Sequence, residues 1–148
     1  MAEPIAIREL RADERAWAAA RYREIQFAAS PPDAVALVAE RAGTPVGLGR
    51  LVSFAPGVVE LGGIWTDESA RGTGVARAMV LALLARPELA GLAARAPDHR
   101  LWCIPFVHLV AFYQSFGFTA VAPPWPPAIA AKVGDCIAHA QDVAVLGR

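Results

Sequence analysis

The sequence contains little cysteine, a single lysine and no surplus of charge of either sign. Its two cysteines, Cys103 and Cys136, are too few for a disulfide framework, and they favour a reducing compartment, the cytoplasm. The 14 basic and 14 acidic residues give a net charge of zero. Because nucleic acids and anionic membranes attract basic surfaces, this balance argues against either as the main partner.

Long apolar runs are also absent, although 55% of the residues are hydrophobic. Arg, Pro or Asp interrupts every apolar stretch before it could span a bilayer. The opening residues have no basic region followed by an apolar run, so they do not read as a signal peptide. His99, His108 and His139 lack the spacing of metal ligands. We expect a soluble cytoplasmic protein without a metal, folded as one domain over residues 1–148.

Two glycines join a predicted strand, Val58–Trp65, to a predicted helix that begins near Gly74. The connecting residues 71–76 read Arg-Gly-Thr-Gly-Val-Ala. Glycines let the backbone turn tightly and come close to a ligand. The start of the helix offers unpaired N–H groups and the positive end of its dipole to an anion. The segment therefore predicts a binding site for a phosphate group, most simply a pyrophosphate.

Two familiar phosphate-binding loops do not fit this segment. The dinucleotide fingerprint G-x-G-x-x-G requires a third glycine at the position that Arg77 occupies. The nucleoside-triphosphate loop G-x-x-x-x-G-K-[ST] requires a lysine, and the only lysine of the chain is Lys132. The phosphate site is therefore of another kind.

The turn resembles the R/Q-x-x-G-x-G/A motif of the GNAT acyltransferases, which Arg71, Gly74 and Ala76 match. Residues 59–68, which read Val-Glu-Leu-Gly-Gly-Ile-Trp-Thr-Asp-Glu, look like the fourth strand of that family and the loop after it.

A second segment, about forty residues further on, is similar to the Y-x-x-x-G-F motif of the same family. Residues 111–118 read Ala-Phe-Tyr-Gln-Ser-Phe-Gly-Phe, and the match is made by Tyr113, Gly117 and Phe118. A helix that stops at a glycine and continues into a strand is also sound local chemistry. Two matches in the order of the family favour membership over coincidence. The resemblance covers residues 58–121 well and the N-terminal half only by pattern.

The hydrophobic pattern predicts a mixed α/β fold in the order β-α(-α)-β-β-β-α-β-α-β-β, which is that of the GNAT acyl-CoA acyltransferase fold with its splayed parallel central strands. A helix between the fourth and fifth strands predicts that these two run parallel. The predicted strands are Ile5–Leu10, Ala34–Arg41, Val46–Phe54, Val58–Trp65, Leu101–Ile104, Phe118–Val121 and Asp142–Leu146. Helices are predicted from an N-cap at Asp13 to Phe27, over Gly74–Ala85 and Val107–Phe116, and near Ala128–Ala138, with a hairpin turn at Ala42-Gly43-Thr44-Pro45.

The resemblance implies that acetyl-CoA (coenzyme A) is the co-substrate. By analogy, main-chain groups on the fourth strand hold the pantetheine arm, and an N–H near Trp65 polarises the thioester carbonyl. The residues implied at the pantetheine arm are Ile64, Trp65 and Thr66. Those implied at the pyrophosphate are Arg71, Gly72, Thr73, Gly74, Val75, Ala76 and Arg77.

Two catalytic candidates follow from the resemblance. Tyr113 stands where the family places a tyrosine beside the sulfur of coenzyme A, so it is expected to protonate the thiolate; the alternative is a tyrosine that only packs in the core. Glu60 is the only carboxylate of the predicted fourth strand and is a candidate base for the amine, or else a surface or ion-paired residue. Phe106 departs from the asparagine that many family members carry, which puts one cofactor contact in question.

Two further features admit a functional and a plain interpretation. Cys103 and His108 could form a nucleophilic pair, although a cysteine in an apolar strand is more often an inert core residue. Trp125, within a proline-rich loop, could close over the acceptor pocket or simply cover the core.

The first hypothesis is therefore an N-acetyltransferase that moves an acetyl group from acetyl-CoA directly to a primary amine. The alternatives are a catalytically silent acyl-CoA-binding or interaction module, and an acyltransferase for a longer acyl group. The absence of any sign of an extended peptide groove favours a small-molecule amine over a protein as acceptor. The resemblance allows a homodimer, of which the sequence itself carries no sign.

Overall fold

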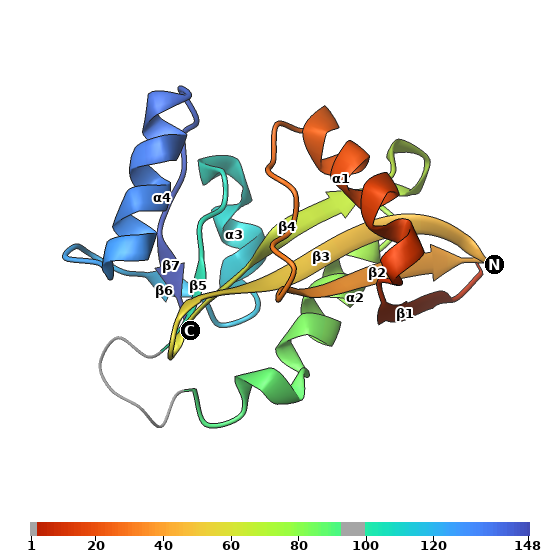
Figure 1. Ribbon diagram of the computed structural model, residues 1–148, viewed down its shortest axis with the longest axis horizontal. Coiled ribbons are helices and arrows are strands. Elements are labelled where there is room, and N and C mark those ends of the chain that lie inside the picture. Colours follow the sequence, from red (N-terminus) through yellow and green to blue (C-terminus); the bar gives the residue numbers. More distant parts are fainter. Residues whose placement is uncertain (1–2, 93–99) are drawn as a thin grey trace. The chain divides into compact units, whose positions relative to one another are not determined.

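Seven strands form one mixed sheet in the computed structural model, which describes residues 3–92 and 100–148 (Figure 1). They are Ile5–Glu9 (β1), Val35–Arg41 (β2), Thr44–Ala55 (β3), Val58–Thr66 (β4), Arg100–Cys103 (β5), Thr119–Ala120 (β6) and Leu146–Gly147 (β7). The strands hydrogen-bond in the order β1-β2-β3-β4-β5-β7-β6. β2 is antiparallel to both β1 and β3, β4 is parallel to β5, and β7 is antiparallel to β5 and β6. The parallel pairing of β4 with β5 confirms the prediction.

Four α-helices lie between these strands in the described part of the chain: Arg15–Glu24 (α1), Val75–Leu84 (α2), Val110–Gln114 (α3) and Pro127–Ala138 (α4). The order confirms the predicted mixed α/β class, including a helix between the two closing strands. Among the residues described, no helix is both long and apolar enough to cross a membrane.

The chain divides into two compact units. The first consists of Met1–Val52 and Gly63–Glu88, and the second of Ser53–Gly62 and Leu89–Arg148. The boundary therefore passes through β3 and through β4. Each unit has a buried hydrophobic cluster of its own. That residues 1–148 act as one domain stays a prediction.

In the first unit, small and large residues alternate along β3, so that α1 and α2 cover opposite faces of the strands (Figure 1). On one face is a buried cluster made of Leu48 with Ala18, Tyr22, Val38 and Trp65. On the other face, a Cβ built on Gly47 would lie 2.6 Å from Val75 Cγ1, and one on Gly49 would lie 2.5 Å from Met79 Cγ. Helix α2 therefore packs directly on the backbone of β3, which leaves no room for a side chain at either glycine.

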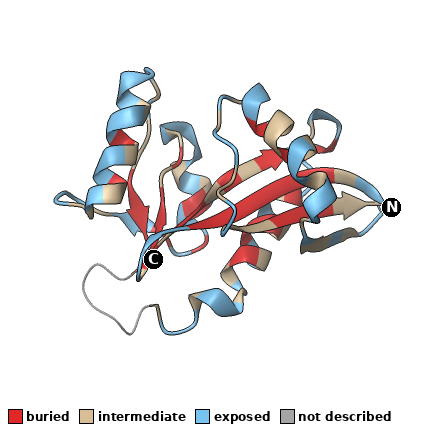
Figure 2. Ribbon diagram, in the orientation of Figure 1, coloured by how far each residue is buried: buried red, intermediate tan, exposed pale blue. Residues whose placement is uncertain are grey.

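Helix α2 confirms the predicted helix after the glycine turn. Its buried face consists of Val75, Met79, Val80 and Leu83. Leu81 on the outer face is 48% exposed, so the helix is buried on one side only. Figure 2 shows this general pattern, with buried residues along the strands and exposed residues on the outer faces of the helices.

Helix α1 is shorter than predicted at both ends. Asp13 is not its N-cap: it lies in a 3₁₀ turn, Ala12–Glu14, and the helix is capped by Glu14. At the other end, Gln26 has a φ of +62°, and the N–H of Phe27 donates to the carbonyl of Tyr22 at 2.8 Å. A left-handed residue closed by such a bond terminates a helix, so α1 ends at Glu24 rather than at Phe27.

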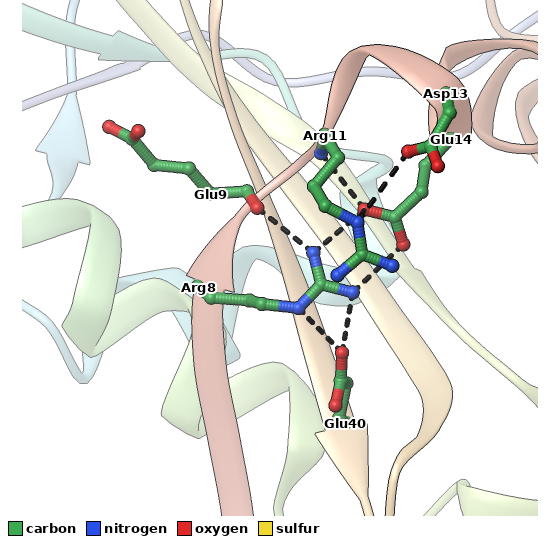
Figure 3. Close-up of polar contacts among 6 residues, drawn as sticks. All are labelled: Arg8, Glu9, Arg11, Asp13, Glu14 and Glu40. Atoms are coloured by element: carbon green, nitrogen blue, oxygen red, sulfur yellow. Dashed lines mark hydrogen bonds and ion pairs between the residues drawn. The ribbon is translucent and has the colours of Figure 1, made fainter.

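The start of α1 is tied to the sheet by Arg8 of β1 (Figure 3). Its guanidinium donates to both carboxylate oxygens of Glu14, at 2.7 and 2.8 Å, and at 2.5 Å to Glu40 of β2. The N–H of Arg11 donates to Glu14 as well, at 2.9 Å. The hydrogen bonds from Arg8 are the main cause that lowers the pKa of Glu14 to about 2.

The turn between β2 and β3 is tighter than predicted. Only Ala42 and Gly43 form it, with φ of +52° and +78°, whereas Thr44 and Pro45 already belong to β3. Two successive left-handed residues are the mark of a two-residue hairpin turn whose twist suits antiparallel strands.

In the second unit, the closing strands β6 and β7 have only two residues each, against the longer strands predicted at Phe118–Val121 and Asp142–Leu146. Residues 142–145 make single backbone bonds instead of a ladder, such as that from Ala144 N to Pro105 O at 2.9 Å. Prolines in the segments on both sides of residues 142–145 explain why the ladder is interrupted, because a proline has no backbone N–H to donate. Likewise, the helix predicted over Val107–Phe116 is divided into a 3₁₀ turn, Val107–Leu109, and the short α3.

Candidate functional site

The predicted pyrophosphate turn lies in the first unit, between β4 and α2. A 3₁₀ turn, Glu68–Ala70, leads into Arg71, and Gly72 follows with a φ of +74°. Gly74 has a φ of +90° and is the N-cap of α2. A Cβ on either glycine would meet nothing within 4 Å. The requirement for glycine therefore comes from the left-handed backbone, which other residues adopt at a cost, and not from crowding by the chain.

The start of α2 has the features of an anion site. The carbonyl of Gly74 accepts the first bond of the helix, from Ala78 N at 3.0 Å, and the first N–H groups of an α-helix lie beyond the reach of its own carbonyls. Gly74 has no side chain to cap them. Arg71 and Arg77, both exposed, add positive charge on either side. A diphosphate fits this arrangement, because its oxygens accept backbone hydrogen bonds and its charge complements the helix dipole.

Arg41 contacts this turn, although the sequence did not predict a role for it. From the end of β2, it donates to Thr73 Oγ1 at 2.9 Å and to the Thr73 carbonyl at 3.4 Å. Thr73 Oγ1 in turn donates to the carbonyl of Ala70. Thr73 stands between the two glycines, so Arg41 holds the turn between its two left-handed residues. Nothing local in the sequence marks this contact, since 32 residues separate the two partners.

The three pantetheine candidates occupy the end of β4. Pairing of β4 with β5 covers Val58, Val59 and Glu60, and the candidates Ile64, Trp65 and Thr66 follow after that. The side chain of Trp65 is buried and meets the ring of Trp17 edge-on, with centroids 5.7 Å apart. The role of these residues stays a prediction that depends on their main-chain groups.

Gly63, which directly precedes Ile64 in β4, was not among the residues predicted for the site. It has a φ of +60° within the strand, and its carbonyl accepts a hydrogen bond from Tyr22 Oη at 2.8 Å. A Cβ here would lie 2.7 Å from Arg50 Nε and 2.9 Å from Tyr22 Oη. Burial raises the pKa of Tyr22 to about 12, so this hydroxyl stays protonated as a donor. The glycine pair Gly62-Gly63 in an otherwise apolar strand was the available signal.

Glu60, the candidate base, lies in the second unit and is 2% exposed. Lys132 Nζ from α4 donates to Glu60 Oε1 and, at 2.5 Å, to Oε2. An ion pair with one buried partner requires this close pairing, because an unpaired charge would be costly there. The arrangement is the ion-paired alternative foreseen for Glu60, and its role as a base stays a prediction. Lys132 was noticed in the sequence only as the single lysine.

Tyr113 lies in the same unit and is 6% exposed. Its ring meets Phe112 and Phe118 edge-on, with centroids 5.0 and 6.1 Å away. Burial is the main cause that raises the pKa of the phenol, and the negative charge of Glu60 raises it further. The hydroxyl therefore keeps its proton at neutral pH, as a proton donor must, although it is a weak acid. Its catalytic role stays a prediction.

Cys103 fits the inert alternative better than a nucleophilic one. It is buried in β5, and both burial and the charge of Glu60 raise the pKa of its thiol, which lowers the fraction of reactive thiolate. His108 lies exposed on the 3₁₀ turn after β5, where its ring stacks on that of Phe106 with centroids 6.0 Å apart.

The remaining candidates have structural surroundings. Trp125 packs against the buried cluster of the second unit and donates from Nε1 to the Val121 carbonyl at 2.8 Å, which is the core-covering alternative. His99 lies outside the described residues. Among those described, no group of three His, Cys, Asp or Glu side chains could hold a metal.

The model of the acetyltransferase (GNAT) family matches residues 5–118, which is more than half of the chain. No curated protein matches the sequence. One similar structure is N-acetylglutamate synthase from Neisseria gonorrhoeae complexed with coenzyme A and N-acetyl-glutamate, with a TM-score of 0.71 and 15% identity over 100% of this chain and 35% of that one. The chain thus spans about a third of the length of that synthase.

Two other similar structures are matched over nearly their full length. Rv2747 from Mycobacterium tuberculosis, in complex with CoA and NLQ, has a TM-score of 0.68 and 16% identity over 95% of this chain and 96% of that one. The ribosomal-protein-S18-alanine N-acetyltransferase from Escherichia coli has a TM-score of 0.63 and 15% identity, over 97% and 92%. At these identities the likeness shows the fold alone. Because the family model covers most of the sequence and the fold agrees with it, the chain belongs to the acetyltransferase (GNAT) family.

Proposed function

We propose that the protein is an N-acetyltransferase that moves an acetyl group from acetyl-CoA directly to a primary amine. The observation that carries this proposal is the turn before α2, with two left-handed glycines and an uncapped helix start between exposed arginines. Two of the similar structures are complexed with coenzyme A, which supports the same co-substrate.

In this proposal the diphosphate of coenzyme A binds to the amides from Gly72 to Arg77. The open space around Gly72 and Gly74 supports the fit, because phosphate oxygens can approach the backbone there. The pantetheine arm follows the main chain of Ile64, Trp65 and Thr66. The thioester carbonyl is polarised by an N–H near Trp65.

The transfer is a single displacement at the carbonyl carbon. The amine nitrogen attacks this carbon, the C–N bond forms, and the C–S bond breaks. The departing thiolate takes a proton from Tyr113, and the amine loses a proton to Glu60 through water. Since Lys132 bonds both oxygens of Glu60, that proton transfer uses a second lone pair on one oxygen or requires Lys132 to move.

The acceptor that we propose is a small-molecule amine, and not a nucleic acid, a membrane or a protein tail. The zero net charge supports the first two exclusions. The two cysteines are free, which is the state expected in a reducing cytoplasm, where we place the enzyme.

An acceptor screen tests the proposal. The protein is mixed with acetyl-CoA and a panel of amines, and released coenzyme A is measured as free thiol. Amine-dependent release supports the enzyme. If coenzyme A binds but no amine accelerates release, the silent binding module is favoured; a larger kcat/KM with a longer acyl-CoA favours the other alternative.

A further inference from the structure

Arg50 is a buried cation without a carboxylate partner among the described residues. It lies on β3 and is 7% exposed. Its Nη1 donates to the carbonyl of Ala28 at 2.9 Å and to Ser30 Oγ at 3.1 Å, which are both neutral groups. Nε is buried and has no hydrogen-bond partner. None of the ion pairs in the described part of the chain includes Arg50.

A guanidinium in this state is costly, because the chain removes most of its water and returns only two neutral acceptors on one side. The ring of Tyr22 lies 4.5 Å from the guanidinium carbon and supplies a cation–π contact, which offsets part of that cost. The Tyr22 hydroxyl donates to Gly63 and does not serve Arg50 as an anion. The residues that the structure describes therefore supply no anion to neutralise the charge of Arg50.

The unpaired edge of Arg50 has a definite chemical preference. Nη1 is engaged, whereas Nε and Nη2 form the opposite edge of the planar group, and the structure gives that edge no hydrogen bond. Two parallel N–H donors at such an edge match the two oxygens of a carboxylate. Next to Nε, Gly63 has no side chain, and a Cβ there would come within 2.7 Å of this nitrogen.

The position of this edge relates it to the reaction. Gly63 directly precedes Ile64, Trp65 and Thr66, the proposed binding residues for the thioester. Ala28 and Ser30, which fix the other edge of the guanidinium, belong to the segment between α1 and β2. Arg50 therefore joins that segment to the point of β4 at which the acyl group is proposed to be presented.

We propose that the Nε–Nη2 edge of Arg50 binds a carboxylate of the acceptor, so that the substrates are amines that also carry a carboxylate, such as free amino acids. This inference rests on the proposed function and names the substrate class of the same site. In it Arg50 is a specificity residue: it pairs with the acceptor, and the buried charge gains its counter-ion when the acceptor binds.

Matched acceptor pairs test the proposal. L-leucine and L-phenylalanine are compared with their α-amides, which differ only in the loss of the carboxylate charge. The α-amides carry a less basic amine, hence more of the neutral nucleophile, so preference for the free acid cannot come from amine ionisation. We expect kcat/KM to be about thirtyfold higher for the free acids, which corresponds to one charge-assisted hydrogen-bonded pair.

The variant R50Q should remove this preference through KM for the free acids, with kcat nearly unchanged. The circular dichroism spectrum and the Tm of R50Q should stay close to those of wild type, which shows that the variant folds. R50K, which keeps the charge but not the planar fork, should recover only part of the preference. The exposed Arg23 of α1 provides the control: R23Q should behave as wild type.

Several results would overturn the proposal. These are equal kcat/KM for acids and amides, an unchanged preference in R50Q, or a stronger response to O-phosphoethanolamine than to the amino acids. If no amine is acetylated at all, the proposed function fails, but the carboxylate site can still be measured. Free L-leucine should then raise the Tm of the wild type and not that of R50Q, and no difference between the two proteins would refute the site.

Discussion

The turn before α2 and the buried residues of the second unit are constructed in opposite ways. The turn, in the first unit, is exposed and uses main-chain groups, and its side chains matter mainly because two of them are missing, at Gly72 and Gly74. In the second unit, Glu60, Tyr113 and Cys103 are buried side chains, and burial together with the charge of Glu60 raises the pKa of both the phenol and the thiol. The difference teaches that the proposed cofactor binding depends on backbone conformation, whereas the proposed proton transfers depend on what surrounds each side chain.

The substitution G74V is expected to have the largest effect. A β-branched residue is strained at a φ of +90°, so the turn should change shape and lose affinity for coenzyme A by at least about a hundredfold. Isothermal titration calorimetry with coenzyme A measures this loss. G91V, which introduces the same strain at a φ of +77° in the second unit, should leave the affinity unchanged. Undiminished binding by G74V would remove the main support for the site.

The substitution Y113F tests the proposed role of a buried side chain in the second unit. Loss of the proposed proton donor should lower kcat by about a hundredfold, while the affinity for coenzyme A and the Tm stay nearly constant. Stopped-flow detection of thiol release together with calorimetry separates the two effects. The neighbouring F112L serves as a packing control, because it alters the same aromatic contacts without removing a hydroxyl. Unchanged turnover in Y113F would assign the tyrosine to the core only.

The substitution K132M tests whether the buried charge of Glu60 depends on its partner. We expect the free energy of unfolding to fall by about 2 kcal/mol, less than for a fully buried pair because the Lys132 side chain is 35% exposed. Urea denaturation measures the change, and the double variant E60Q/K132M should recover most of it. If the double variant is no more stable than K132M, the loss does not come from an uncompensated charge.

The substitution R41M asks whether side chains contribute to the turn at all. Without the bonds to Thr73, affinity for coenzyme A should fall about fivefold, since these bonds are exposed and charge-assisted. T73S keeps the hydroxyl and should bind normally, whereas T73V should resemble R41M. Equal affinities for wild type, R41M and T73V would make the turn independent of Arg41.

The smallest effect concerns the part-buried pair of Arg8 and Glu14. Because the pKa of Glu14 is lowered in the folded state to about 2, its contribution to stability is complete above its ordinary pKa near 4.5. That contribution is lost as the pH falls from about 4.5 to about 2. E14Q should therefore be less stable than wild type by at most about 1 kcal/mol at pH 7, with the difference vanishing in acid. Thermal unfolding across this pH range measures it, and a constant difference would exclude the linkage.

The features that local backbone chemistry determines could be predicted from the sequence. The glycines at 72 and 74 predicted a tight turn, and a helix between β4 and β5 predicted that these two strands run parallel. Predictions were wrong where a side-chain contact or a backbone bond that the hydrophobic pattern does not show decided the outcome. Asp13 lost the N-cap to Glu14, which Arg8 and Arg11 hold in place. The closing strands were shortened by prolines and single backbone bonds.

The candidate site likewise contains residues that could be predicted from the sequence and residues that could not. Residues 71–77 run without interruption from the turn into the first residues of α2. Because they are adjacent in the sequence, they could be predicted together as one binding site. Lys132 and Arg41 could not be found, because their partners lie 72 and 32 residues away, respectively. Arg50 has no local signal either, since only the folded chain reveals that a strand arginine is buried without a carboxylate.

The pairing of Lys132 has one more consequence. An enzyme that holds an activated acyl group exposes its own amines to acylation, and Lys132 is its only lysine side chain. As an ammonium bonded to both oxygens of Glu60, this nitrogen has no lone pair with which to attack a thioester. Under the proposed function, the ion pair keeps Lys132 from being acylated by the bound thioester, and an amine-selective label should react with Lys132 faster in E60Q than in wild type.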